Sequence, residues 1–228
     1  MALGTYTEGG IGSNASASVN STSFTPAANS ILIVFGAAYR VFNTISPPAA
    51  SGGGLTYNLI GTATLDTGIH RISVRAWYAA VGGSPSSMQV TVSSTSASET
   101  VVQCSYVTGA STDFANVQTQ TRASDGSVSM TLPSAPAASS YATLGTINVT
   151  NNGPGTPSGY SSFGTIAIGN SYFGQFYDST SPGASAASSD GGATQAAAIM
   201  FEIKEAAAAV GSFLFPSISP AVMHMLVR

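Results

Sequence analysis

The sequence predicts an all-β protein, built as a single β-sandwich or jelly-roll-like domain of about ten strands. Apolar residues occur either in short runs rich in Val, Ile and Phe or in alternation with polar residues, and both patterns are typical of strands. The stretches between them are rich in Gly, Pro, Ser, Asn and Asp, which favour turns. No segment has convincing helical spacing, and the alanines of 206–209 precede Gly211 and Pro216 too closely to form more than about one helical turn.

The expected strands follow one another along most of the chain. Residues 30–40, SILIVFGAAYR, form a continuous apolar run that suits a central strand buried on both faces. Residues 71–80 alternate, which places Ile72, Val74, Ala76 and Tyr78 on one face and Ser73, Arg75 and Trp77 on the other. The same reasoning predicts the remaining strands at 55–61, 88–94, 99–107, 127–132, 141–150, 163–169, 171–178 and 196–204.

Two stretches of the chain resemble each other. SVNSTSFTPAANSILIVF and SVSMTLPSAPAASSYATL each contain a short strand pattern, a Pro-Ala-Ala sequence and a second strand pattern. Either a structural duplication or the low complexity of the chain would produce this similarity. Because no linker separates the two stretches, we expect one domain at 19–205, an N-terminal arm at 1–18 and an apolar C-terminal docking arm at 206–228.

The chain carries very little charge for its length. Six Lys and Arg and nine Asp and Glu are found among 228 residues, a charged fraction of 7% against roughly 25% in an average soluble domain. Such a surface is either covered by neighbouring subunits or built from neutral polar residues. The net charge of −3 and the scattered arginines argue against nucleic-acid binding. The first residues lack the pattern of a signal peptide, so we expect synthesis in the cytoplasm.

The sequence contains no recognisable catalytic or metal-binding signature, so we expect a protein that is not an enzyme and has no cofactor. A hydrolase would require His70 to meet a carboxylate, and Asp66 is the nearest one in the sequence. Zinc sites require several closely spaced Cys or His residues, which the chain lacks. The single cysteine, Cys104, lies in an apolar run and is expected to be a buried core residue.

Aromatic residues are the candidates for a ligand site. In the expected strand 171–178, Tyr172 and Phe176 share one face, and Phe173 and Tyr177 share the other. These rings, together with Trp77, can belong to the core, to a subunit interface or to a glycan-binding surface, and the pattern does not choose among them.

The segment 206–228 is the most unusual part of the sequence. No charged residue occurs from Ala206 to Met223, but Pro216 and Pro220 argue against a membrane-spanning helix. We therefore expect an extended arm that buries its large apolar side chains on this sandwich or on a neighbouring subunit. These subunit-interface candidates are Phe213, Leu214, Phe215, Val222, Met223, Met225 and Leu226.

The order FTPAANSILIVFGAAYR, LTYNLIGTA and RISVRAWYAAVGGSPSSMQVTVSS resembles a loose group of small β-sandwich structural proteins from the virions of tailed bacteriophages. The resemblance spans roughly residues 15–205 and rests on the style of the sequence, without a signature motif or transferable site residues. It implies a non-enzymatic, homo-oligomeric virion component, located on the capsid exterior as a decoration protein or in a tail or fibre. A glycan-binding adhesin or receptor-binding module is the alternative.

Overall fold

The protein is built from strands, and the part of the chain that the structure describes contains no helix. The computed structural model describes residues 2–124, 127–149, 153–178, 184–188 and 195–207. The strands are β1 (Thr7–Asn14), β2 (Ser18–Asn20), β3 (Ser30–Val41), β4 (Ala49–Gly52), β5 (Asn58–Asp66), β6 (His70–Ala80), β7 (Val90–Ser93), β8 (Glu99–Thr108), β9 (Val117–Arg122), β10 (Val128–Thr131), β11 (Tyr141–Val149), β12 (Ser161–Ile168), β13 (Ser171–Asp178), β14 (Ser185–Ser188) and β15 (Gln195–Ile203).

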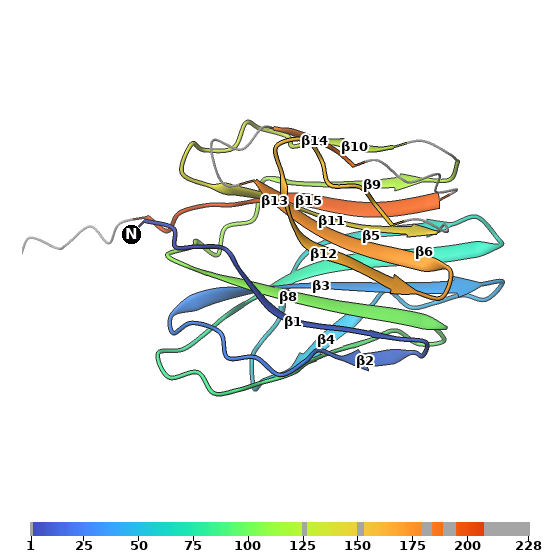
Figure 1. Cartoon of the computed structure of the whole chain (residues 1–228), viewed down its shortest axis with the longest axis horizontal. Coiled ribbons are helices and arrows are strands. Elements are labelled where there is room, and N and C mark those ends of the chain that lie inside the picture. The colour runs from blue at the N-terminus through green and yellow to red at the C-terminus, as the bar shows by residue number, and fades with distance from the viewer. Residues whose placement is uncertain (1, 125–126, 150–152, 179–183, 189–194, 208–228) are drawn as a thin grey trace, which may run out of the picture.

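Four antiparallel sheets are stacked as layers (Figure 1). The two central sheets have five strands each, in the orders β1-β8-β3-β6-β5 and β12-β13-β11-β15-β9. A three-stranded sheet, β2-β7-β4, covers the outer face of the first, and the pair β10-β14 covers the outer face of the second. One apolar core fills the space between the central sheets, and a smaller core lies under each outer sheet. The predicted all-β sandwich is confirmed.

The layers explain the burial of the central strands. Strand β3 lies between two cores, so Phe35 points into the shared core and Val34 into the outer one, as its continuous apolar run predicts. In β6 the predicted inward face also holds, because Ile72 and Val74 belong to the shared core. The opposite face of β6 is covered by the outer sheet, and Trp77 is therefore buried.

The topology of β1–β8 is repeated by β9–β15. Read from the other edge, the second central sheet has the order β9-β15-β11-β13-β12. This order matches β1-β8-β3-β6-β5 strand by strand, so that β9 corresponds to β1, β15 to β8, β11 to β3, β13 to β6 and β12 to β5. The outer pair β10-β14 likewise corresponds to β2-β7. The similarity between the two Pro-Ala-Ala stretches therefore reflects two halves with one strand order.

Details of the two halves agree at the level of single residues. The hydroxyls of Ser30 and Ser140 donate to the carbonyls of Ala27 and Ala137, in both cases at 2.7 Å. The edge strands β5 and β12 each contain a bulge at the corresponding place in their pairing with β6 and β13.

Aromatic pairs also correspond between the halves. Trp77 and Phe176 each lie in the core under their own outer sheet, whereas Tyr78 and Tyr177 pack against the shared core. Trp77 pairs with Val34 and Phe176 with Leu144, on the equivalent strands β3 and β11.

The halves meet through a knob-and-hole contact between their central strands. Phe35 of β3 is fully buried and lies above Gly145 of β11, where an added Cβ would come within 2.3 Å of the ring. Phe35 also packs against Phe173 and Phe201, with ring centroids 6.0 and 5.6 Å apart. Ser30 corresponds to Ser140, and Phe35 and Gly145 each follow five residues later, so they occupy equivalent positions. Equivalent positions of the two halves therefore face each other, but they hold unlike residues.

Polar contacts also join the two halves. The Gln175 side-chain nitrogen donates to the Tyr6 hydroxyl at 2.9 Å, and the Ser105 hydroxyl donates to the same oxygen at 2.8 Å. Burial raises the pKa of Tyr6 to about 12. Near the end of the shared core, Glu99 of the first half accepts hydrogen bonds from the Asn170 backbone nitrogen at 3.2 Å and from the Ser171 hydroxyl.

The range 1–18, predicted as an arm, differs most from expectation among the described residues. It contains β1, which pairs with β8 along the edge of the first central sheet, and the buried Tyr6. The range also contains Ser18, the first residue of β2. The polar and glycine-rich sequence TEGGIGSN gives no apolar alternation, because an edge strand buries little of its surface.

Candidate functional site

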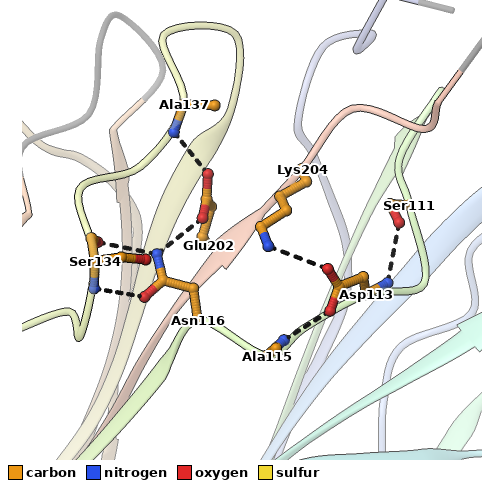
Figure 2. Close-up of polar contacts among 8 residues, drawn as sticks. All are labelled: Ser111, Asp113, Ala115, Asn116, Ser134, Ala137, Glu202 and Lys204. Atoms are coloured by element: carbon orange, nitrogen blue, oxygen red, sulfur yellow. Dashed lines mark hydrogen bonds and ion pairs between the residues drawn. The ribbon is translucent and has the colours of Figure 1, made fainter.

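The end of β15 is held by a polar network on the outer face of the second central sheet (Figure 2). Glu202 is 2% exposed, and its two carboxylate oxygens accept hydrogen bonds from the Ala137 backbone nitrogen at 2.7 Å and the Asn116 side-chain nitrogen at 2.8 Å. Hydrogen bonds to a charged group contribute about 1.5–3 kcal/mol each. The carboxylate thus fixes β15 to the two loops that precede β9 and β11.

Asn116 extends this network to a second loop position. Its side chain donates to the Ser134 carbonyl at 3.1 Å and accepts from the Ser134 backbone nitrogen at 3.2 Å. The Glu202 backbone nitrogen donates to the Asn116 carbonyl at 3.1 Å. Asn116 therefore ties the connection between the two halves to the Pro-Ala-Ala loop of the second half.

Two residues after Glu202, an ion pair fixes the same connection. Lys204 Nζ lies 3.1 Å from Asp113 Oδ2, and the Ser111 backbone nitrogen donates to the Lys204 carbonyl at 2.8 Å. The backbone N–H of Ala115 and the ammonium group of Lys204 both lower the pKa of Asp113. Figure 2 shows Lys204 and Asp113 beside the Glu202 network. We refer to Asp113, Asn116, Glu202 and Lys204 as the β15 anchor.

The anchor fixes the point at which the chain leaves the folded body. Ala110 forms a bridge with Glu205, and the Ala206 backbone nitrogen donates to the Gly109 carbonyl at 2.8 Å. The chain is held by hydrogen bonds up to residue 206, immediately before the uncharged segment.

A small cavity lies beside this exit point. Its volume is about 210 Å³, and its lining residues are Ala2, Leu3, Ser139, Ser140, Tyr141 and Glu205. Pockets that enclose small-molecule ligands usually measure about 300–1,000 Å³, so this cavity is small for such a ligand.

The predicted glycan-binding residues do not form one exposed surface. Trp77, Phe173 and Phe176 are buried in three different cores. Tyr177 is partly buried and stacks on Phe163 with ring centroids 4.5 Å apart. Tyr172 is also partly buried. The stacking faces that sugar binding requires are thus covered in at least three of the five rings.

The predicted interface residues lie outside the described part of the chain. They are Phe213, Leu214, Phe215, Val222, Met223, Met225 and Leu226.

The residues considered for catalysis have other contacts. His70 Nδ1 lies 2.8 Å from the Tyr39 hydroxyl, while Asp66 forms an ion pair with Arg71 at 2.8 Å. Cys104 is buried in the core under β2-β7-β4, and this burial raises the pKa of its thiol. Within the described ranges, no three His, Cys, Asp or Glu side chains group together as a metal site would require. None of the described elements is a helix long and apolar enough to cross a membrane.

Sequence reasoning did not identify the β15 anchor. One signal was present, because Glu202 interrupts the apolar run AAAIMFEIK and Lys204 is the only lysine of the chain. A charged residue inside an apolar strand requires a partner, but the sequence does not reveal that Asn116 and Ala137 supply it.

Comparisons of the chain with protein-family models, with curated proteins and with solved structures give no match.

Proposed function

We propose that this protein is a non-enzymatic structural subunit that assembles through the segment 206–228, as a decoration, tail or fibre component of a bacteriophage virion. The observation that carries the proposal is the fixed exit of this segment, uncharged from Ala206 to Met223, from the end of β15. An anchored strand gives a docking segment a defined starting point, and this lowers the entropy that the segment loses when it binds.

The composition of the segment supports a role in assembly. Phe213, Leu214 and Phe215 follow one another, and each gains about 1.5–3 kcal/mol when its side chain leaves water. Pro216 and Pro220 favour an extended chain, which can follow a neighbouring subunit over a long distance.

The surface of the folded body fits the same role. Only four large apolar side chains are exposed among the described residues, namely Ile11, Phe42, Leu59 and Ile69. Strands at the edges of the central sheets instead present Ser, Thr and Gln, as in SSFGTIAI of β12 and VQTQTR of β9. A polar, sparsely charged body with one apolar segment favours specific association through that segment over general adhesion.

Sedimentation analysis of the full chain and of a chain that ends at residue 211 tests this proposal. We expect the full chain to form a defined oligomer and the shortened chain to keep its β-sheet circular dichroism but remain monomeric. A full chain that stays monomeric and does not bind purified capsids or tails would overturn the proposal. A shortened chain that fails to fold would show that the segment belongs to the core of its own subunit.

The virion assignment has its own test. Antibodies against the protein, applied to purified particles of the phage that encodes it, should label the capsid exterior, the tail or the fibres. Particles that carry no label and contain none of the protein by mass spectrometry would refute this part of the proposal.

A further inference from the structure

The two halves differ at one place in their outer sheets. In the first half, β4 pairs antiparallel with β7 and forms the third strand of the outer sheet. In the second half, β14 corresponds to β7, but no strand among the described residues pairs with its other edge. The connection that contains β4 spans 42–57, whereas the corresponding connection spans only 150–160 and forms no strand in its described part, 153–160.

Each half contains a tyrosine whose hydrogen bonding differs in keeping with this difference. Tyr57 directly precedes β5, packs against the first outer core and donates its hydroxyl to the Gly52 carbonyl of β4 at 3.2 Å. Tyr160 directly precedes β12 and packs in the same way against the second outer core. Its hydroxyl oxygen is buried and has no hydrogen-bond partner among the described residues. The partner that Tyr57 finds in β4 is therefore the one that Tyr160 lacks.

The Tyr160 hydroxyl is suited to donate a hydrogen bond to a strand at this place. Burial raises its pKa, and the nearby carboxylate of Asp178 raises it further, so the hydroxyl remains protonated. A buried hydroxyl without a partner is unfavourable, and a carbonyl group brought next to it would remove that cost.

The free edge of β14 offers backbone groups for pairing. The Leu132 nitrogen donates to the Ala184 carbonyl, and antiparallel pairs alternate, so Ala186 is hydrogen-bonded to β10. The N–H and C=O groups of Ser185 and Ala187 then point away from β10, toward the free edge. A strand edge of this kind, with which no described residue pairs, is a template for an added strand.

We propose that an extended strand from residues 212–228 of a second copy of this chain pairs with the free edge of β14 and accepts the hydrogen bond of Tyr160. The proposal rests on the assembly role proposed above and names the surface that receives the segment. Residues 221–228, AVMHMLVR, follow the last proline and are long enough to cover the four residues of β14. Their only charged residue at neutral pH is Arg228, which suits an apolar outer core.

The direction of the chain favours a second copy over the same chain. The first residue of β14 and the end of β15 lie at the same end of the second half. The loop between β10 and β11 reaches both: its Leu132 donates to Ala184, just before β14, and its Ala137 donates to Glu202, near the end of β15. A segment that continued directly from the end of β15 along β14 would run parallel to it. An antiparallel strand, like β4 on β7, approaches from the opposite end, which a segment from a second copy can reach.

The first test uses full-length variants of the receiving edge, with association constants measured by sedimentation velocity. Ala187→Pro removes the outward N–H group of β14, and Ser129→Pro removes the outward N–H group of β10 on the opposite edge of the same pair. We expect Ala187→Pro to weaken association at least about tenfold and Ser129→Pro to leave it unchanged. Equal association of Ala187→Pro and the unaltered chain would overturn the proposal.

Conservative variants keep the test decisive if a proline disturbs the outer sheet. Tyr160→Phe should weaken association by about three- to tenfold, because it removes one hydrogen bond to the incoming strand. Tyr57→Phe is the matched control and should leave association unchanged, since its partner Gly52 lies in its own half. The opposite order of effects would refute the proposal.

Complementation separates exchange between copies from pairing within one chain. The Val222→Asp/Leu226→Asp variant has an altered segment and an intact β14, and Ala187→Pro has the reverse. Each variant alone should be monomeric, whereas their mixture should form a 1:1 complex. No complex in the mixture would show that the segment pairs within its own chain or elsewhere, and the proposal would fail. Normal assembly of both variants would refute the assembly role of the segment as well, whereas loss of assembly only in the segment variant would refute β14 alone.

Discussion

Gly145→Ala tests the knob-and-hole contact between the two halves. The added Cβ would lie 2.3, 2.4 and 3.0 Å from three atoms of the Phe35 ring. Carbon atoms in contact are about 3.5–4.0 Å apart, so the ring must move by more than about 1 Å. Phe35 cannot move freely, because it is fully buried and packs against Phe173 and Phe201.

The size of the effect follows from two opposing contributions. Overpacking of a core costs about 1–3 kcal/mol, while the smaller backbone entropy of alanine in the unfolded chain returns about 0.4–1 kcal/mol. We therefore expect Gly145→Ala to lower the free energy of unfolding by about 1–2 kcal/mol. Gly61→Ala is the matched control, because its nearest contacts would be at 3.4 Å, and its effect should stay within about 0.5 kcal/mol.

Urea denaturation of the two variants, of Phe35→Ala and of the double variant completes this test. Phe35→Ala alone should cost about 3–5 kcal/mol, because it leaves a cavity. In the double variant the new methyl group partly fills that cavity, so the combined cost should be about 1–3 kcal/mol smaller than the sum. Additive costs, or a Gly145→Ala variant more stable than the original protein, would refute the contact.

Two further predictions concern pH and backbone strain. Tyr6 has its pKa raised to about 12 in the folded state, so its neutral hydroxyl contributes stability that is fully present below about pH 10 and is lost as pH rises through 12. Between pH 9 and 12, the free energy of unfolding should fall by roughly 2 kcal/mol less in Tyr6→Phe than in the original protein. Equal slopes would contradict this assignment. Phe42 has a φ of 64° and is 71% exposed, so Phe42→Gly should raise the free energy of unfolding by about 0.5–1 kcal/mol in urea melts. Phe42→Ala keeps the Cβ and should give no such gain, whereas an equal gain would show that strain at this φ is not the cause.

The sequence predicted the strands that bury apolar side chains and missed those that do not. All ten expected strand regions overlap observed strands. The five missed strands, β1, β2, β4, β9 and β14, are short, polar or rich in Gly and Ala. Their positions are set by backbone pairing to β8, β7, β15 and β10, which leaves little trace in hydrophobic periodicity.

The duplication and the candidate site show a second limit. The Pro-Ala-Ala similarity was visible, but the correspondence of Trp77 with Phe176 is a single aromatic exchange that only the strand register identifies. The proposed receiving edge of β14 was not predictable, because it depends on a strand of the first half, β4, that has no counterpart among the described residues of the second half. The unpaired hydroxyl of Tyr160 likewise becomes informative only beside its counterpart Tyr57.

The contact of Phe35 with Gly145 also bears on how such a chain can evolve. If two separate, identical copies of one half met through their central strands, every substitution would appear on both sides of the contact at once. A phenylalanine would then face a phenylalanine, and a glycine would face a glycine. When both halves lie in one chain, each side of the contact can change independently. One side can then hold a large residue such as Phe35 while the other holds a glycine that leaves room for it. The same freedom allows the first half to hold β4 at a place where the described residues of the second half form no strand.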